Sequence, residues 1–584
     1  MQKRVIDNKR EKMPDSLPLK VTLKSLFILL KLYWTKKESL ISWFYLFIII
    51  VLTGGSVYIA TRINSWYKDF WDTITNYDIN GFTKQIGIFV IIASIHVVVT
   101  VYNSFIKSKM SIHWRRYITE VTMQKWLEND TYYKIQLADH NTDNPDQRIA
   151  EDLKLFVSDT IVLFIGLVTD LAMIVSFSIV LWTLSQSVDV TLFNGYVLHL
   201  PDGYLLYLAM AYAVLGTTIT FILGKPLVRL NFRQQRYEAD FRFSLIRVRE
   251  ASESIALYKG ENEESATLKE RFTHVVKNYI LLINCTKRLG FLTLGYAQTA
   301  VIFPILIAAP IYFAKLITMG TIMQINSAFG RVQGALSTLV MNFSSWASWK
   351  AVVDRLAMFA NCMDEAQKLE TLRAKQISKT KLEVYNISIK TQDDRDLVKD
   401  ISFELNIGDR LLIQGKSGCG KSTFIRSLAG IWPYTKGSIS MPKKDDILFL
   451  SQKPYLPQGT LRQALYYPKP IRDNDNELIE YMHALDLDHL VAKLDTDTMW
   501  SLILSLGEMQ RVAFIRALLT KPKVLFLDEA SSALDDDMEM IAYKLVVETL
   551  NESIIISVGH RSTLHEMHNK LLLIKDNRAI FKDY

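Results

Sequence analysis

Apolar residues occur in long runs before about residue 360, whereas the remainder of the chain alternates short apolar runs with polar segments. A helix of about 20 mostly apolar residues is long enough to span a bilayer. The candidate spans are 40–62, 86–106, 157–184, 203–224, 289–318 and 325–349. The first five are too long and too apolar for buried helices of a soluble protein. The sixth is less apolar, and we predict it chiefly from its position in the series.

Lysine and arginine are distributed unevenly among the segments that join these spans. Segment 185–202 contains none and 63–85 contains only two, whereas 107–156 and 225–288 are rich in both. Basic loops stay on the cytoplasmic side of a membrane. We therefore predict that the N-terminus, the two basic segments and the C-terminal half are cytoplasmic, and an even number of spans agrees with this.

The two basic segments are too long for simple connections, and their helical patterning predicts that the membrane helices continue into the cytoplasm. The amphipathic stretch 20–38 is typical either of a helix on the membrane surface or of a frayed cytoplasmic helix. His96, Asp170 and Arg331 are ionisable residues within the spans. A charge at mid-bilayer costs about 2.5–3.5 kcal/mol, so they indicate either a polar passage or positions near the span ends.

Composition and charge agree with a membrane protein. Of the 584 residues 49% are hydrophobic, and the mean hydropathy is +0.12. The net charge of +8 is what basic cytoplasmic loops produce, and because no nucleic-acid-binding motif is present we predict no nucleic-acid partner. We expect neither a disulfide framework from three widely spaced cysteines nor a cleaved signal peptide in the polar first 38 residues.

The hydrophobic pattern changes around residues 360–380, where a polar helix and linker are followed by short β-like runs. We therefore predict two domains. Residues 1–375 form an all-α transmembrane domain of six helices, and residues 376–584 form an α/β P-loop domain.

A P-loop lies between a strand-like run and a helix-like run. Its residues are Gly415, Lys416, Ser417, Gly418, Cys419, Gly420, Lys421 and Ser422, with Thr423 following. In such a loop the glycines let backbone N–H groups surround phosphates, and the helix N-terminus adds a favourable partial charge. We predict that Lys421 reaches the outer phosphates and that Ser422 ligates Mg²⁺. Taken alone, the motif predicts only nucleotide binding.

An apolar strand over 523–527 ends in the carboxylates of Asp528 and Glu529. This pattern predicts Asp528 beside Mg²⁺ and Glu529 beside the γ-phosphate, where it can polarise water as a general base. The alternative is a solvated strand end. The P-loop upstream makes that alternative the weaker interpretation.

Further motifs lie before and after these carboxylates. The segment 504–511 (LSLGEMQR) precedes them, 532–535 (SALD) follows them, and His560 comes after the run SIIISVG. Together with the P-loop and Gln452, this order resembles the ATP-binding cassette (ABC) family over residues 380–584. A lone histidine after a strand is more often structural, but in this order we interpret His560 as the γ-phosphate sensor.

The resemblance implies how the site residues work. Gln452 would sense Mg²⁺ and contact the membrane domain, while Ser505, Gly507 and Glu508 would bind ATP held by the opposite subunit. Asp535 would belong to the same ATP site. Because two such cassettes sandwich two ATP molecules, one cassette per chain implies a dimer, most simply a homodimer.

The predicted catalytic and metal-binding sets follow from these roles. The catalytic residues are Glu529, His560 and Gln452. The Mg²⁺ ligands are Ser422, Gln452 and Asp528.

A narrower resemblance extends over nearly the whole chain. It rests on the runs DNPDQRIAEDL (143–153), NFRQQRYEADFRFSLIRVREASESIALYKGE (231–261), SAFGRVQGAL (327–336), FLSQKPYLPQGTLRQALYYP (449–468) and SVGHRSTL (557–564). These runs resemble the SbmA/BacA-related transporters, bacterial inner-membrane proteins associated with peptide antibiotics, bleomycin and vitamin B12. More distantly they resemble the peroxisomal half-transporters of long-chain acyl-CoA. Leu506 and Glu508 depart from the usual signature glycine and glutamine, but Ser505 and Gly507 remain.

We therefore predict an exporter-like half-transporter that couples ATP hydrolysis to movement of a bulky solute across the bacterial inner membrane. The ATP-binding domain and both termini would be cytoplasmic. A peptide, a vitamin B12-like molecule or another large hydrophilic compound is the predicted solute, with uptake as the preferred direction. The alternatives are an exporter of lipid or fatty-acyl substrates and a membrane-bound regulatory ATPase that moves no solute.

Overall fold

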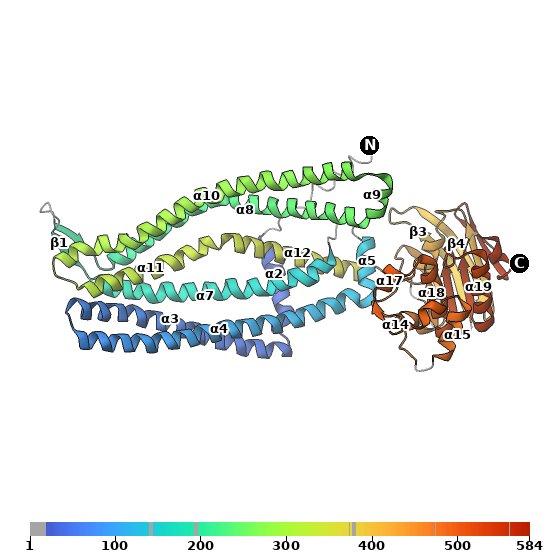
Figure 1. Cartoon of the computed structure of the whole chain (residues 1–584), viewed down its shortest axis with the longest axis horizontal. Helices are drawn as coiled ribbons and strands as arrows, with labels where there is room; N and C mark the ends of the chain where they lie inside the picture. Colours follow the sequence, from blue (N-terminus) through green and yellow to red (C-terminus); the bar gives the residue numbers. More distant parts are fainter. Residues whose placement is uncertain are drawn as a thin grey trace. The chain divides into compact units, whose positions relative to one another are not determined.

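The computed structural model describes residues 19–138, 144–191, 197–372, 374–375, 381–472, 475–559 and 561–583. The chain forms two compact units. One comprises Met1–Lys125 and Asp143–Asn361, and the other comprises Trp126–Thr142 and Cys362–Tyr584. The first unit is helical and the second is an α/β unit (Figure 1), which confirms the predicted fold class.

Long helices make up the first unit. They are α2 (Leu19–Trp34), α3 (Leu40–Thr75), α4 (Ile79–Leu127), α7 (Leu153–Leu184), α8 (Tyr204–Glu250), α10 (Glu261–Phe313), α11 (Met319–Met341) and α12 (Phe343–Lys368). Short elements join them: η1 (Lys37–Ser39), α6 (Pro145–Gln147), the π-helical turn η3 (Arg148–Asp152), the hairpin β1 (Val188–Thr191)–β2 (Val197–Leu200), and α9 (Ser252–Tyr258).

The helices α4, α8 and α10 have 49, 47 and 53 residues, more than twice the length that a bilayer requires. Each is continuous from its apolar span into the neighbouring basic segment. The helices therefore extend well beyond their apolar parts, and the cytoplasmic location of these extensions stays a prediction. The helices α8 and α10 lie side by side, and α9 joins their far ends (Figure 1).

Five helical segments among the described residues are long and apolar enough to cross a membrane. They are Lys37–Thr75, Ile79–Leu137, Pro145–Leu184, Tyr204–Glu250 and Glu261–Phe313. They overlap the first five predicted spans. The sixth predicted span, 325–349, falls on α11 and the start of α12, so a count of six stays a prediction. Because α11 packs against α3, α7, α8 and α10, its surface needs less apolar character than that of a helix facing lipid.

The amphipathic N-terminal stretch forms α2, which packs into the first unit. Leu29 and Tyr33 are buried there, and the Thr22 hydroxyl donates a 2.6 Å hydrogen bond to the Asp354 carboxylate of α12. The Lys350 ammonium approaches the other oxygen of that carboxylate at 2.7 Å. One face of α2 is therefore fixed against the helix that leads out of the unit.

A buried ion pair joins the turn before α7 to α12. Asp152 is 2% exposed, and its two carboxylate oxygens accept hydrogen bonds from Arg355 Nε and Nη2 at 2.9 and 2.7 Å. Arg148, itself buried, binds the same carboxylate from one turn earlier. A carboxylate removed from water is tolerated only when charged partners satisfy its oxygens, and here two guanidinium groups do so.

A nine-stranded sheet forms the centre of the second unit, in the order β6-β3-β4-β13-β12-β5-β11-β10-β7. Its strands are β3 (Lys381–Lys390), β4 (Asp396–Asn406), β5 (Arg410–Gly415), β6 (Thr435–Ser440), β7 (Ile447–Leu450), β10 (Val524–Asp528), β11 (Ile554–Val558), β12 (Lys570–Lys575) and β13 (Arg578–Asp583). The strands from β12 to β7 are parallel, and the β6–β3 and β3–β4 pairs are antiparallel.

Helices cover both faces of this sheet. They are α13 (Lys421–Leu428), α14 (Leu461–Tyr466), α15 (Asn476–Ala484), α16 (Asp488–Val491), α17 (Trp500–Ile503), α18 (Leu506–Thr520) and α19 (Asp536–Thr549). Phe424 of α13 belongs to one apolar core, and Phe514 of α18 with Tyr543 of α19 belongs to the other. Parallel strands covered on both faces are apolar throughout, and the β10 and β11 side chains are buried along almost their entire length.

A short segment that follows α4 also packs in the second unit. It consists of η2 (Glu128–Asp130) and α5 (Thr131–Ala138). Lys134 and Ile135 of α5 are buried, and the Lys134 ammonium donates to the Leu369 carbonyl at 3.3 Å. The unit that contains the P-loop therefore includes a helix from the first basic segment.

Replacing Arg355 with alanine should destabilise the first unit, because Asp152 would keep only Arg148 as a charged partner. Removing one partner of a buried ion pair costs about 3 kcal/mol or more. We expect a lower midpoint of thermal unfolding for the full-length protein in detergent. Arg116→Ala is the control, since the Arg116–Glu120 pair is exposed and should not shift the midpoint. Equal midpoints for both variants would contradict the role of the buried pair.

Acid should destabilise the second unit through His568. Its Nδ1 contacts the Leu564 carbonyl at 2.7 Å and its Nε2 the Ser557 hydroxyl at 2.8 Å, and burial lowers the pKa of His568 to about 4. Above pH 6.5 the imidazole is neutral in both states. Between pH 6.5 and 4 only the unfolded state takes up the proton, so the free energy of unfolding falls by about 3 kcal/mol over this range.

Thermal unfolding of the full chain between pH 4 and 7 measures this effect. His568→Gln should flatten that part of the pH dependence. His483→Gln, at an exposed histidine, should leave it unchanged. The same slope in the wild type and in His568→Gln would refute the assignment.

Candidate active site

The P-loop, Gln452 and the Asp528–Glu529 pair lie where strands of one parallel group end. The β5, β11, β10 and β7 strands lie side by side, with Asp528 opposite Val558 and Leu527 opposite Leu450. The carboxyl ends of parallel strands share one edge of a sheet, and ligands of open α/β folds bind at that edge. The shared direction of these strands therefore brings segments that are far apart in the sequence to one edge of the sheet.

The P-loop connects β5 to α13. Gly418 and Gly420 have φ angles of +78° and +103°, in the left-handed region that favours glycine. A side chain at Gly415 would place its Cβ 2.6 Å from the Ile574 carbonyl oxygen, so only glycine fits. The loop thus curls tightly before the N-terminus of α13, with the residue types and backbone that cradle phosphate groups.

Lys421 is 6% exposed, and its ammonium lies across the loop. The Nζ atom donates to the carbonyl oxygens of Gly415 at 2.8 Å and of Lys416 at 3.2 Å. Among the residues that the structure describes, no carboxylate forms an ion pair with it. The ammonium donates to two carbonyl oxygens and has no paired carboxylate, which suits a group that binds phosphate.

Ser422 and Asp528 lie together although 106 residues separate them. The Ser422 hydroxyl donates to the Asp528 carboxylate at 3.1 Å. Burial raises the pKa of Asp528, the neighbouring Glu529 charge raises it further, and the Ser422 hydrogen bond opposes both effects. A bound cation would relieve that cost.

These two oxygens fit Mg²⁺, which takes oxygen ligands and is usually held by one or two carboxylates plus substrate phosphates. No group of three or more His, Cys, Asp and Glu side chains able to hold a metal occurs among the described residues. The donor set therefore suits an ion that arrives with a nucleotide rather than one held by the protein alone.

Glu529 begins the loop after β10 and has a φ angle of +49°, which is unusual for a residue with a side chain. Its N–H donates to the Val558 carbonyl at 3.1 Å, and its own carbonyl accepts from Ser532 N–H at 3.1 Å. Backbone strain of this kind persists where surrounding contacts determine the geometry, often at functional sites. The carboxylate is half-buried beside Asp528.

The remaining predicted residues at this edge are placed differently. Gln452 follows β7, two residues beyond the position paired with Leu527, but its side chain is exposed and forms no hydrogen bond with Ser422 or Asp528. Thr423 lies in the first turn of α13. His560 lies outside the described residues.

Ser505 is the N-cap of α18 and forms a capping box with Glu508. The Ser505 hydroxyl accepts from the Glu508 N–H at 3.3 Å, and the Glu508 carboxylate accepts from the Ser505 N–H at 2.8 Å. Glutamate and glutamine both fit this position of a capping box, so Glu508 keeps the local structure of the usual signature. Burial raises the pKa of Glu508, but hydrogen bonds from Ser505 and His489 outweigh it and lower the pKa below its usual value.

The signature residues are not joined to the P-loop of the same chain. No hydrogen bond in the described structure connects Ser505, Gly507 or Glu508 with residues 415–423. Asp535, the other predicted ATP contact, caps α19, where its carboxylate accepts from the Met538 N–H at 2.7 Å. One chain thus presents a P-loop site and a separate signature surface.

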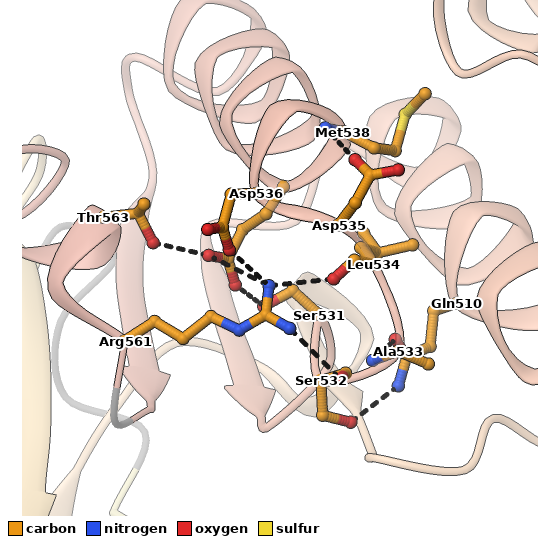
Figure 2. A network of polar contacts seen from close by, with 11 residues as sticks. Gln510, Ser531, Ser532, Ala533, Leu534, Asp535, Asp536, Met538, Arg561 and Thr563 are labelled. Carbon is orange, nitrogen blue, oxygen red and sulfur yellow. Dashed lines mark hydrogen bonds and ion pairs between the residues drawn. The ribbon is translucent and has the colours of Figure 1, made fainter.

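Two residues of this region were not predicted from the sequence. Gln510 and Arg561 hold the segment 532–535 from opposite sides (Figure 2). The available signal for Gln510 is its position three residues after Gly507, which puts both on the same face of a helix. For Arg561 the signal is adjacency to His560.

Comparison with known proteins agrees with both units. Residues 29–313 match the family model of the ABC transporter transmembrane region 2, and residues 398–532 match the ABC transporter model. An uncharacterized ABC transporter ATP-binding protein of Haemophilus influenzae is 36% identical, covering 93% of this chain and 91% of that protein. The inner membrane ABC transporter ATP-binding protein YddA of Escherichia coli is 31% identical, with 93% and 96% covered. The human lysosomal cobalamin transporter ABCD4 is 26% identical, with 90% of each chain covered.

These matches extend over the helical unit, the P-loop unit and the segment between them. The two family models together span most of the chain in the order membrane region, then ATP-binding domain. The chain therefore belongs to the ABC transporter family, and it is a half-transporter that carries the membrane region and the ATP-hydrolysing domain in one polypeptide.

Proposed function

We propose that this protein acts as a homodimer in the bacterial inner membrane and uses ATP hydrolysis to move a bulky hydrophilic solute. The observation that carries the proposal is the separation, within one chain, of the P-loop edge from the signature surface. A P-loop site lacking a signature is completed when a second copy supplies Ser505 and Gly507. Closed two-fold symmetry then forms two equivalent ATP sites.

In the proposed site, Lys421 and the P-loop N–H groups bind the phosphates of ATP. The water that attacks the γ-phosphate lies beside Glu529. The Glu529 carboxylate takes a proton as the water oxygen bonds to the γ-phosphorus. The bond from that phosphorus to the bridging oxygen breaks, leaving ADP and inorganic phosphate. His560 is the proposed γ-phosphate contact. Positioning and electrostatics supply most of the catalysis in such reactions.

Ser422 and Asp528 would hold Mg²⁺, with Gln452 as a further proposed ligand. A bound Mg²⁺ would supply charge neutralisation at the phosphate oxygens. The Ser422–Asp528 hydrogen bond supports this assignment, because it holds the two oxygens 3.1 Å apart at the same edge of the sheet. Gln452 would reach it by a side-chain rotation from its exposed position.

The proposed topology has six spans, a domain boundary at 375/376, and both termini with the ATP-binding domain in the cytoplasm. The basic segments that continue α4, α8 and α10 support this orientation. Tighter binding of ATP by the closed dimer than by the open dimer would drive the helices between two arrangements. Hydrolysis would then reopen the dimer.

We propose a cargo resembling the vitamin B12 or peptide substrates associated with the SbmA/BacA-related transporters. The printed name of the human relative, a cobalamin transporter, favours the same class of solute. We propose uptake as the direction. A lipid-like or fatty-acyl cargo that is exported is the second candidate, favoured by the distant resemblance to acyl-CoA half-transporters.

Glu529→Gln should retain ATP binding and lose turnover by at least about a hundredfold, the lower range for removal of a general base. Lys421→Ala should lose both, because the buried ammonium would no longer oppose the phosphate charge. Steady-state ATPase activity in lipid nanodiscs and binding of a fluorescent ATP analogue measure the two effects. Turnover of Glu529→Gln near the wild-type rate would exclude Glu529 as the base.

Cells that express the wild type should take up labelled cobalamin or a labelled proline-rich peptide faster than cells that express Glu529→Gln. The variant is a matched control because it keeps the membrane region and the ability to bind ATP. The solute whose uptake falls in the variant is identified as cargo. Equal uptake of both by the two strains would contradict solute import and favour export or a regulatory ATPase.

A further inference from the structure

Gln510 is a fully buried amide at the junction of three functional segments. Its Nε2 donates to the Gln452 carbonyl at 2.8 Å and to the Ser532 hydroxyl at 3.1 Å. Its Oε1 accepts from the Ala533 N–H at 2.9 Å. Both N–H groups and the oxygen are thus satisfied, as a buried amide requires. One side chain of α18 thereby connects the segment after β7 with the segment after β10.

The signature glycine touches the same segment. A Cβ on Gly507 would lie 3.1 Å from the Ala533 carbonyl oxygen, so the two backbones are in van der Waals contact. Gly507 and Gln510 are one turn apart on α18. The segment 532–535 is therefore held against the signature helix at two points and cannot shift independently of it.

Arg561 holds that segment from the opposite side (Figure 2). Its Nη1 donates to the Leu534 carbonyl at 2.8 Å, and its Nη2 donates to the Ser532 carbonyl at 3.4 Å. Nη1 also approaches the carboxylates of Asp536 at 3.2 Å and of Glu539 at 3.6 Å. Glu539 is 1% exposed, whereas the Arg561 side chain is 35% exposed, so the guanidinium reaches the buried carboxylate from the surface. A planar fork is suited to binding two carbonyls at once.

The segment 532–535 follows the proposed catalytic base, Glu529, by one turn. The Ser532 N–H donates to the Glu529 carbonyl at 3.1 Å, which makes residues 529–532 a single turn. A displacement of α18 is thus transmitted through Gln510 and Ser532 to the backbone of Glu529. These hydrogen bonds, with the buried Gln510 side chain at their centre, tie the turn to α18.

We propose that Gln510 and Arg561 are positioning residues that couple the two ATP sites of the dimer. In the proposed dimer, the signature of one chain contacts ATP held by its partner. Gln510 links that signature to the Glu529 turn of its own chain, and Arg561 holds this turn in position. Engagement of one ATP molecule therefore aligns the base that acts on the other. This inference rests on the proposed dimeric site.

Gln510→Met and Arg561→Met test the coupling, because methionine fills similar volume without these hydrogen bonds. The control is Lys544→Met, on the exposed face of α19. ATPase rates in nanodiscs are measured against ATP concentration. We expect wild type and control to be cooperative, with a Hill coefficient approaching about 2 for two coupled sites. The Hill coefficient of both test variants should approach about 1, and their kcat should be at least about tenfold lower. Their binding of a fluorescent ATP analogue should change less than about twofold.

Conservative variants separate positioning from stability. One ammonium can take the place of Nη1 but cannot bind both carbonyls, so Arg561→Lys should recover part of the cooperativity. Gln510→Glu keeps the acceptor for Ala533 but loses both donors, and it should remain uncoupled. A lower kcat and a lower unfolding temperature with unchanged cooperativity would show a merely structural role and overturn the inference. An uncooperative wild type would likewise overturn the inference, whereas a wild type that hydrolyses ATP as a monomer would overturn the dimeric site itself.

Discussion

Four neighbouring parallel strands must end at one edge of the sheet for this site to exist. The inner strands β5, β11 and β10 carry mostly buried apolar side chains, and β7 at the sheet edge is partly exposed, so charged groups occur only where the chain leaves the core. Asp528 stands at that point, and its pKa is raised because the core still partly surrounds it. The Ser422 hydroxyl, in the first turn of α13 after β5, offsets some of that cost. Nucleotide chemistry at this edge is therefore a consequence of strand direction.

Buried carboxylates of the helical unit are likewise satisfied by polar partners. Asp152, before α7, and Asp354, in the middle of α12, are buried carboxylates, and each is held by a cation one turn earlier and by one group from a distant segment. Apolar packing alone would hold the helices without fixing their register, because apolar contacts are not directional. Directional contacts to α12 define which turn of α2 and of α7 meets it. The helix that leads toward the ATP-binding domain is thereby fixed at both contacts.

Most of the architecture was predictable because local sequence patterns indicate it. Long apolar runs predict membrane helices, short apolar runs predict strands, and the glycines of 415–420 predict a phosphate loop. Contacts between residues distant in sequence have no such pattern: nothing near Asp152 indicates Arg355, and Gln510 resembles any polar residue of a helix. The capping box of Ser505 and Glu508 is intermediate, since its spacing is visible in the sequence, but its part in holding the signature emerges only with the geometry. The predicted sixth span stays untested, and the lower apolar content of α11, on which most of it falls, fits a helix that packs against α3, α7, α8 and α10.

The glutamate in the signature raises an electrostatic problem that residues outside the motif address. The hydrogen bonds of Ser505 keep Glu508 ionised, so a negative charge stands beside the surface that would face an anionic γ-phosphate. Repulsion between like charges at this distance would oppose closure of the dimer. The Glu508 carboxylate, however, points back to the Ser505 N–H and to His489 Nε2, which lies 2.9 Å from its other oxygen. Both oxygens are satisfied by donors within the same chain, which offsets part of the repulsion that the Glu508 charge would exert on an incoming phosphate. A signature that departs from the usual sequence can therefore keep Ser505 and Gly507 in their proposed roles because His489 supports it from a neighbouring helix.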